Sequence, residues 1–207
     1  MLKTALVLGA TGLVGQQLIA QLCSDSRYKS IVCLVRKPLG YELAFSHDDK
    51  LQPIVIDFAA LQDYQGYFGV DHVYVCLGST IKKAGNRKAF RKVDFEYIHV
   101  AAQLARAQHV QSFVWISSVG ANAQSSLFYL RVKGELENAI FKLSGLEHAS
   151  AVRPSLLLGN RKEHRLAEKI GGLLAGLLSP LFVGPFAKYK PIQAAEVATK
   201  MIQLQVF

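Results

Sequence analysis

The sequence predicts an α/β fold: a doubly wound parallel sheet with helices on both faces, formed by residues 1–207 as one domain. Two observations support this prediction. Apolar segments of strand length alternate with helical segments along the chain, and the first of them runs directly into a glycine-rich turn. With 51% hydrophobic residues, a chain of 207 residues can bury one sizeable core, so we expect no second full domain.

Six strands are expected in order along the chain, over residues 4–8, 30–35, 51–57, 71–77, 112–117 and 147–152. A helix follows the glycine turn, and further helices are predicted over residues 87–108, 128–143 and 194–204, where apolar residues recur at helical spacing. Ligands of such sheets bind at the carboxyl ends of the strands. The residues that end strands are therefore the candidates for a functional site.

The glycine turn after the first strand is the strongest of these candidates. Gly9 would permit a tight turn, Gly12 would let backbone N–H groups approach a pyrophosphate, and Gly15 would let the next helix pack closely. An anion would then lie at the positive N-terminus of that helix. An ordinary strand-to-helix turn is the alternative. We predict a nucleotide-cofactor site formed by Gly9, Thr11, Gly12, Leu13, Val14 and Gly15.

The end of the second strand indicates which cofactor is bound. An NAD site usually carries an acidic residue here for the ribose 2′-hydroxyl, whereas an arginine can accommodate a 2′-phosphate. This chain has Arg36 and Lys37 at that point, so we predict NADP, with both residues at the cofactor. A solvated arginine at a strand end is the alternative interpretation.

The other strand ends carry polar residues or glycine, and they should meet at the same rim as the glycine turn. Asp57 either accepts a hydrogen bond from an adenine amino group, with Phe58 beside the ring, or caps the turn that follows it. We assign the remaining cofactor contacts to the residues that end the fourth, fifth and sixth strands: Leu77, Gly78, Ser79, Thr80, Ser117, Arg153 and Pro154.

A catalytic group is predicted from three residues that follow the fifth strand. Tyr129 and Lys133 are four positions apart on an expected helix and so share a face. A nearby ammonium favours the phenolate, which makes the phenol a better proton donor. Ser118 could hydrogen-bond the same carbonyl or hydroxyl oxygen. We predict Ser118, Tyr129 and Lys133 as the catalytic residues, with Tyr129 and Lys133 also contacting the cofactor, and no metal site; an amphipathic helix with a packed tyrosine is the alternative.

The glycine turn, Ser117-Ser118, Tyr129-x-x-x-Lys133 and Arg153-Pro154 together resemble the short-chain dehydrogenases/reductases. Residues 76–85, 129–135 and 153–159 resemble the atypical, Tat-interacting-protein-like subgroup of that family, over nearly the whole chain. The resemblance implies a Rossmann fold, bound NADPH, a Ser/Tyr/Lys active site, and Gly78, Ser79 and Thr80 on the nicotinamide side.

One departure from the family pattern concerns the helix between the fourth and fifth strands. Standard members place an asparagine there to complete a proton relay, and this chain has Asp94. A carboxylate could hold a relay water, but its charge differs from that of an amide. The departure makes catalysis harder to infer than cofactor binding.

The sequence therefore predicts an NADPH-dependent oxidoreductase that reduces a small, apolar carbonyl compound. Two alternatives remain open. One is a non-catalytic NADPH-binding regulatory or interaction protein, since relatives are known partly as regulators. The other is a nucleotide-sugar epimerase, for which the residues after the sixth strand are few.

The region expected to cover the substrate is residues 155–193, a substrate pocket or lid. Within it, residues 170–186 are strongly apolar but are interrupted by glycine and proline, so we expect no transmembrane helix. This segment could line an apolar pocket, form a homodimer or membrane-surface contact, or belong to the core.

Charge and cysteine content bear on partners and location. The net charge is +9, and six cations without an intervening acid form a basic segment: Lys82, Lys83, Arg87, Lys88, Arg91 and Lys92. The segment is either a solvated helix face or a surface for an anionic or protein partner; no nucleic-acid-binding module accompanies it. The three cysteines lie in apolar surroundings, and with no secretion signal they predict a cytoplasmic protein.

Overall fold

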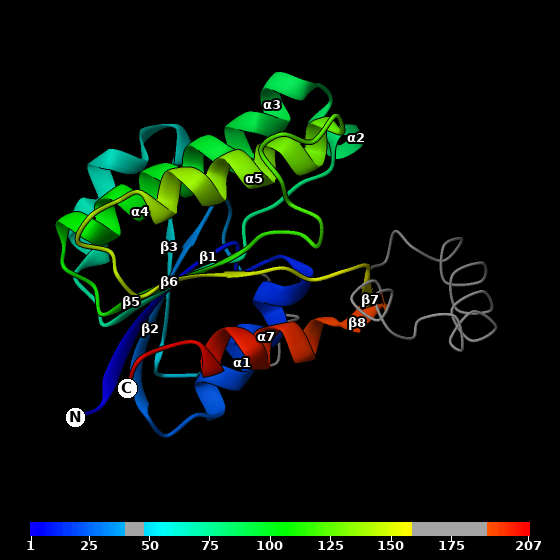
Figure 1. Cartoon of the computed structure of the whole chain (residues 1–207). Coiled ribbons are helices and arrows are strands. Elements are labelled where there is room, and N and C mark those ends of the chain that lie inside the picture. Colours follow the sequence, from blue (N-terminus) through cyan, green and yellow to red (C-terminus); the bar gives the residue numbers. More distant parts are fainter. Residues whose placement is uncertain (40–47, 159–189) are drawn as a thin grey trace.

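The fold is a six-stranded parallel sheet between two layers of helices, as Figure 1 shows. The computed structural model describes residues 1–39, 48–158 and 190–207. The strand order is β3-β2-β1-β4-β5-β6, so the chain winds outward from β1 in one direction and then from β4 in the other. This order is that of a doubly wound Rossmann sheet, and it confirms the predicted fold class.

The six predicted strands are all present, with slightly different ends. They are β1 (Lys3–Leu8), β2 (Tyr28–Val35), β3 (Leu51–Val55), β4 (His72–Val75), β5 (Ser112–Ile116) and β6 (Ala149–Val152). A separate parallel pair is formed by β7 (Leu157–Leu158) and β8 (Ile192–Gln193).

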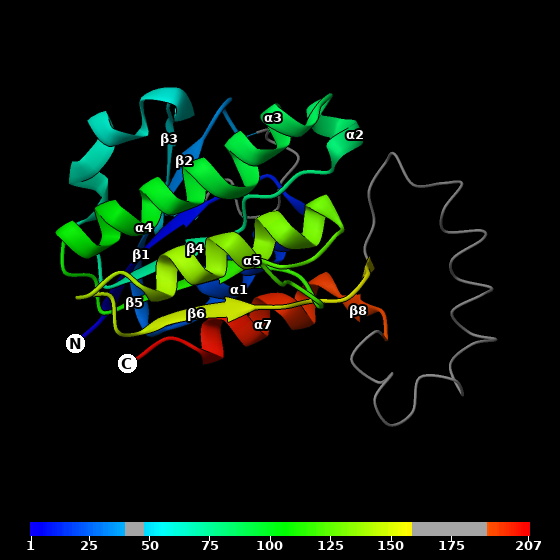
Figure 2. The same cartoon turned by 45° about the horizontal axis from the view of Figure 1, so that its top comes forward.

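Helices cover both faces of the sheet. One layer contains α1 (Leu13–Ser24) and α7 (Ala194–Gln203), and the other contains α4 (Tyr97–Ala107) and α5 (Phe128–Phe141). Figure 2 shows α4 and α5 side by side over one face of the sheet. Shorter segments complete the second layer: the 3₁₀ segment η1 (Phe58–Phe68), α2 (Ile81–Ala84), α3 (Arg87–Arg91) and the π-helical turn η2 (Lys92–Glu96).

The prediction of a single helix over residues 87–108 is wrong in that the helix is not continuous. The chain there forms α3, the π turn η2 and α4 in succession, so one helical turn in the middle is widened. A π turn inserts an extra residue into a helix and shifts the register of the side chains that follow. Helical spacing of apolar residues alone does not reveal such a turn.

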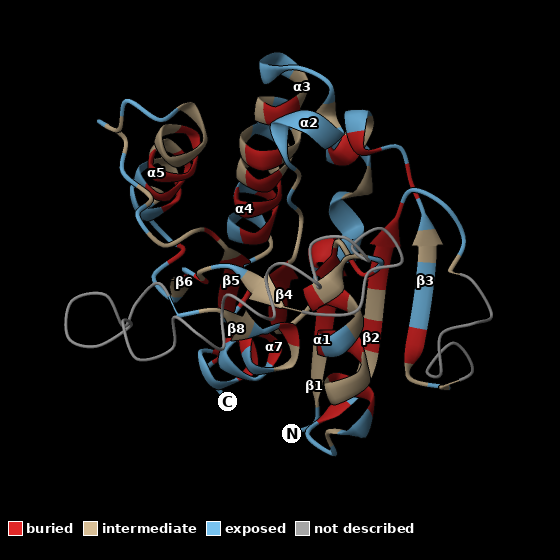
Figure 3. Cartoon of the chain, turned by 90° about the vertical axis from the view of Figure 1, so that its right-hand side faces the viewer, coloured by how far each residue is buried: buried red, intermediate tan, exposed pale blue. Residues whose placement is uncertain are grey.

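The core consists of two apolar layers separated by the sheet. Along β1, Ala5 and Val7 face the layer of α1 and α7, whereas Leu6 and Leu8 face the layer of α4 and α5. All four are 0% exposed, and the alternation follows from the two-residue repeat of a strand. Figure 3 shows the buried central strands and the buried inner sides of the helices. The sheet is thus a rigid support for the residues at its ends.

The predicted pocket or lid region, residues 155–193, lies largely outside the described residues, as does its apolar part, residues 170–186. Its two flanks are described, and they pair as β7 and β8, with Leu157 opposite Ile192. In the described part of the chain, no helix is both long enough and apolar enough to cross a membrane.

Candidate functional site

The site lies at the end of the sheet where the carboxyl ends of the strands meet, called here the carboxyl rim. In Figures 1 and 2 this end carries α2, α3, the start of α5 and the β7–β8 pair, and both chain termini lie at the opposite end. The neighbouring strands β1 and β4 are the point at which the winding direction reverses, which is where doubly wound sheets bind ligands.

Close backbone packing holds the glycine turn in place. Gly9 has φ +86°, and a Cβ there would lie 2.6 Å from the carbonyl carbon of Cys76, directly after the neighbouring strand β4. A Cβ on Gly15 would overlap the Gly9 carbonyl oxygen, so the first turn of α1 packs directly on the loop. The glycines therefore permit a close approach of backbone segments that a side chain would prevent.

The N-terminus of α1 is free to bind an anion as far as the described residues show. Its N-cap is Gly12, no side chain caps it, and its first turn has no acidic residue. The first backbone N–H groups of a helix need acceptors and carry partial positive charge. The glycine turn and the uncapped helix fit the pyrophosphate of a dinucleotide, and contacts of Thr11, Leu13 and Val14 with it stay predictions.

The two cations predicted to select NADP lie next to this turn. β2 runs beside β1 with Leu34 opposite Leu8, so Arg36 and Lys37 leave the sheet beside the glycine turn. Both side chains are exposed. They can reach a ligand at the turn without disturbing the core.

The end of β3 favours one of the two interpretations left open for Asp57. Its Oδ1 accepts a hydrogen bond from the Ala59 N–H at 2.8 Å, so Asp57 caps η1. Phe58 is 5% exposed and packs on Tyr97 at a ring distance of 5.7 Å, in the core rather than beside a ligand. A contact of either residue with adenine stays a prediction.

The predicted catalytic residues come from β5 and α5. Ser117 and Ser118 follow β5, and Tyr129 lies in the first turn of α5 with Lys133 one turn later. The Tyr129 ring packs on the ring of the buried Phe90 of α3, at a distance of 5.6 Å between ring centres. The Ser117 hydroxyl is buried and has no hydrogen-bond partner among the described residues.

Lys133 is held by a buried carboxylate. Its Nζ lies 2.8 Å from Oδ1 of Asp94, and the two side chains are 2% and 1% exposed. Burial raises the pKa of the Asp94 carboxyl above its ordinary value, and the Lys133 ammonium opposes this shift. Lys133 Nζ also lies 3.4 Å from the Ile116 carbonyl oxygen on β5.

The segment that ends β4 is held by the same carboxylate. Asp94 Oδ2 accepts a hydrogen bond from the Ser79 N–H at 2.8 Å, and Gly78 lies beside Oδ1. The Thr80 hydroxyl accepts from the Lys83 N–H at 3.1 Å and caps α2. Leu77 to Thr80 are thus fixed beside the Asp94–Lys133 pair, and their place on the nicotinamide side stays a prediction.

Arg153 has a protein partner that the sequence did not indicate. Its guanidinium forms a two-bond ion pair with the buried Glu137 on α5, including Nε to Oε1 at 2.9 Å. Pro154 is buried, and its carbonyl oxygen accepts from the Val119 N–H at 2.9 Å. These two residues tie the loops after β5 and β6 together; their predicted cofactor contacts stay predictions.

Sequence reasoning missed two further residues that shape the site. A Cβ on Gly134 of α5 would overlap the backbone of Asn122 and Ala123, so this glycine lets the loop that follows Ser118 lie against the helix. Phe90 supports the Tyr129 ring. A glycine inside a helix is costly, and its position directly after Lys133 is the signal that could have revealed its role.

Comparison with known proteins places these features in a family. A family model described as NAD(P)H-binding matches residues 9–171. Protein FMP52-1, mitochondrial, of Scheffersomyces stipitis is 35% identical over 201 residues, which cover 94% of this chain and 84% of that protein. Protein HTATIP2 of Rattus norvegicus is 32% identical over 186 residues, covering 89% of this chain and 75% of that protein.

Solved structures show the same fold at low sequence identity. A UDP-N-acetylglucosamine 4-epimerase from Methanobrevibacter ruminantium superposes with a TM-score of 0.72 at 16% identity, covering 97% of this chain and 72% of that one. The Bordetella bronchiseptica enzyme WbmH, in complex with NAD⁺, has a TM-score of 0.72 at 15% identity, covering 99% and 72%. These likenesses concern the fold alone.

The comparisons correct the predicted cytoplasmic location. Cys23 and Cys33 are buried free thiols, as expected, but reduced thiols do not identify a compartment. The FMP52 relatives from Scheffersomyces stipitis, Candida albicans and Debaryomyces hansenii are all designated mitochondrial.

Proposed function

We propose that this chain is an NADPH-dependent oxidoreductase that reduces a small, apolar carbonyl compound. The chain belongs to the NAD(P)H-binding family, together with the HTATIP2 and FMP52 proteins. These proteins are of the atypical short-chain dehydrogenase/reductase type. One observation carries the proposal. The residues for proton donation, Ser118, Tyr129 and Lys133, stand at the same carboxyl rim as the glycine turn and the uncapped α1.

The chemistry divides between the cofactor and the chain. Bound NADPH supplies a hydride to the carbonyl carbon. Tyr129 donates its phenolic proton to the carbonyl oxygen, which gives the alcohol, and is then reprotonated from solvent. The Ser118 hydroxyl donates a hydrogen bond to the same oxygen, and the Lys133 ammonium favours the phenolate that remains on Tyr129.

The choice of NADPH over NADH rests on Arg36 and Lys37. Both are exposed at the end of β2, beside the glycine turn, and no residue in the described ranges pairs with them. A charge-assisted hydrogen bond contributes about 1.5–3 kcal/mol, so one such bond to a 2′-phosphate gives on the order of tenfold to a hundredfold preference.

Substitution of the proton donor tests this function. Tyr129→Phe should lower turnover of a reducible carbonyl by about 10²- to 10⁴-fold and leave NADPH affinity unchanged, because the ring still packs on Phe90. Turnover is followed by NADPH absorbance over a panel of aldehydes and ketones. Tyr67→Phe, which removes the hydroxyl of an exposed tyrosine on η1, is the control. Full turnover by the Tyr129 variant would exclude the mechanism.

The second candidate is a non-catalytic protein whose partner binding responds to NADPH. The observation that favours it is the basic segment, in which Lys82, Lys83, Lys88 and Lys92 are exposed and lack a carboxylate within 4.0 Å among the described residues. This candidate predicts cofactor-dependent binding of a protein partner or a second copy of the chain. It also predicts no NADPH consumption with any carbonyl, which separates it from the reductase.

A further inference from the structure

The buried carboxylate of Asp94 contacts two parts of the site at once. Oδ1 lies 2.8 Å from Lys133 Nζ on α5, and Oδ2 accepts the Ser79 N–H at 2.8 Å at the end of β4. We propose that Asp94 is a positioning residue that keeps the Lys133 side chain charged and in place and aligns the Ser79 backbone with it. The catalytic consequence of this role rests on the proposed function.

The π turn brings Asp94 into the interior. In η2 (Lys92–Glu96), Asp94 is the buried residue, although its neighbours Val93 and Phe95 are partly exposed. Before and after it, the buried residues Phe90 and Ile98 fix α3 and α4 on the core. The widened turn therefore places the Asp94 carboxylate in the protein interior, between the buried side chains of Phe90 and Ile98. A charged group is buried in this way only when it is paired.

The contacts of Lys133 leave limited freedom for its ammonium. One of its three N–H groups faces Asp94, and a second faces the Ile116 carbonyl oxygen at 3.4 Å. The third remains for the Tyr129 hydroxyl or for a ligand hydroxyl. Asp94 thus determines where that third N–H points, as well as the position of the backbone beside it.

No second carboxylate replaces Asp94 in the described part of the chain. On α5 the titratable neighbours are Tyr129, one turn before Lys133, and Glu137, one turn after it, and Glu137 pairs with Arg153. Beneath Lys133, β5 offers the Ile116 carbonyl oxygen, which carries no charge. Without Asp94, the buried ammonium would stand alone, and burial favours the neutral amine.

The direct test follows the Lys133 amine itself, with no cofactor and no substrate. NMR spectra of protein with ¹³C-labelled lysine are recorded against pH, and the Lys133 signal is assigned by its loss in Lys133→Met. We expect the Lys133 amine to lose its proton at a lower pH in Asp94→Asn than in the wild-type protein, because the buried ammonium has then lost its carboxylate partner. Glu135→Gln, on the same helix as Lys133, breaks the more exposed ion pair between Glu135 and Arg91 of α3 and should leave the titration unchanged.

Stability supplies a second readout if Asp94→Asn folds poorly. The lone buried charge should lower Tm by about 10 °C, and the double variant Asp94→Asn, Lys133→Met should recover most of that loss, because both charges are then absent. An unchanged Lys133 titration in Asp94→Asn, or a double variant no more stable than the single one, would overturn the proposal.

Cofactor titration separates this inference from the proposed function. As the pH is raised through the range in which NMR shows the variant's Lys133 amine losing its proton, the NADPH affinity of Asp94→Asn should fall about three- to tenfold relative to that of the wild-type protein. If the wild-type protein binds no NADPH, the proposed function fails, and the lysine titration still decides the role of Asp94. If NADPH binds and the affinity of the variant follows the wild-type pH dependence, the role of Asp94 in keeping Lys133 charged is wrong.

Discussion

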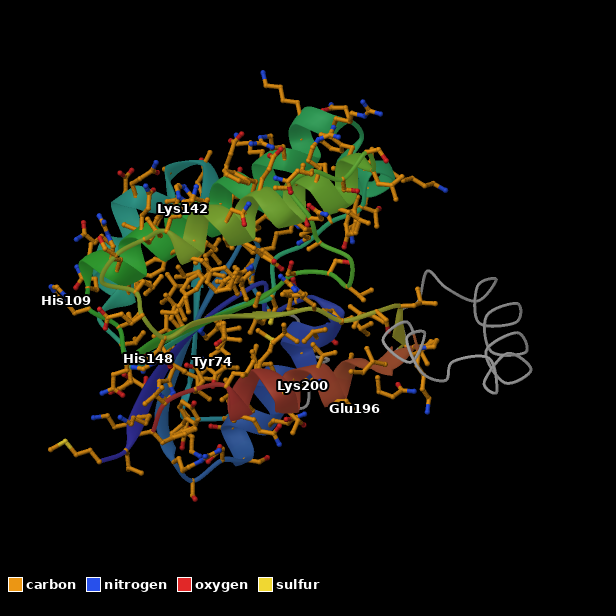
Figure 4. The ribbon with its side chains drawn as sticks, in the orientation of Figure 1. Tyr74, His109, Lys142, His148, Glu196 and Lys200 are labelled. Carbon is orange, nitrogen blue, oxygen red and sulfur yellow. The ribbon has the colours of Figure 1, made fainter. Side chains whose placement is uncertain are left out.

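The two ends of the sheet differ in whether their buried polar groups have hydrogen-bond partners among the described residues. At the end opposite the carboxyl rim, called here the amino edge, Tyr28 Oη lies 2.7 Å from His72 Nδ1 and 2.7 Å from Tyr74 Oη. The His72 Nε2–H donates to the Val206 carbonyl oxygen at 2.6 Å, so Nδ1 accepts from Tyr28. Figure 4 shows Tyr74 on the α7 side of the sheet. All three of these buried side chains are hydrogen-bonded within the described residues.

The carboxyl rim leaves comparable groups open. Its glycine turn ends in the uncapped α1, and the buried Ser117 hydroxyl has no partner among the described residues. The charged groups there are held by two ion pairs, Asp94–Lys133 and Glu137–Arg153. Since buried polar groups are normally hydrogen-bonded, the two ends differ in how fully the described residues satisfy these particular groups.

The largest expected difference between the two ends comes from the glycine turn. Gly15→Ala would place a Cβ on the Gly9 carbonyl oxygen, so the loop must move. We expect a loss of about 1–3 kcal/mol in the free energy of unfolding, from overpacking, together with loss of nucleotide binding. Urea denaturation and NADPH titration measure the two effects.

The matched control is Gly66→Ala on η1, where a Cβ would meet no atom within 4 Å. It should retain stability and nucleotide binding. If Gly15→Ala bound NADPH as tightly as the control does, the close packing of the turn would have no part in binding.

A smaller effect is expected at the amino edge when the pH falls. Burial lowers the pKa of His72 below its ordinary value of 6.5. The unfolded chain then takes up a proton near pH 6.5 while the folded chain does not, so stability falls as the pH decreases from about 6.5 toward the folded-state pKa. Thermal unfolding between pH 7 and pH 5 measures this loss.

Two substitutions isolate the contribution of His72. His72→Gln should show a smaller decrease in Tm over this pH range than the wild-type protein. His148→Gln, at an exposed histidine labelled in Figure 4, should follow the wild-type slope. A His72 variant with the wild-type slope would show that the amino edge is not the acid-sensitive part of the fold.

The sequence predicted the fold and the rim because both depend on local patterns. Alternating apolar segments determine a parallel sheet, and strand order then brings the glycine turn, Ser117 and Tyr129 to one end. The Asp94–Lys133 contact could not be predicted in this way, since it joins residues far apart in the chain through a π turn that apolar spacing does not reveal.

The same limit applies to other paired charges at the site. Arg153 looked available for a ligand because its partner, Glu137, lies on a preceding helix and is recognisable as a partner only once α5 has packed beside β6. Likewise, Phe58 lies next to a strand end in sequence but turns into the core against Tyr97. Sequence position indicates which end of the sheet a residue reaches, and packing decides which way its side chain points.

The central claim, that the carboxyl rim binds NADPH, is tested most directly by calorimetric titration of the protein with NADPH and NADH. We predict that NADPH binds on the order of tenfold to a hundredfold more tightly. Arg36→Glu should lose most of the NADPH affinity and little of the NADH affinity. The control Arg106→Glu, at an exposed arginine on α4 with the same change in charge, should lose neither. Equal affinities for the two cofactors, or equal losses in Arg36→Glu, would contradict the account.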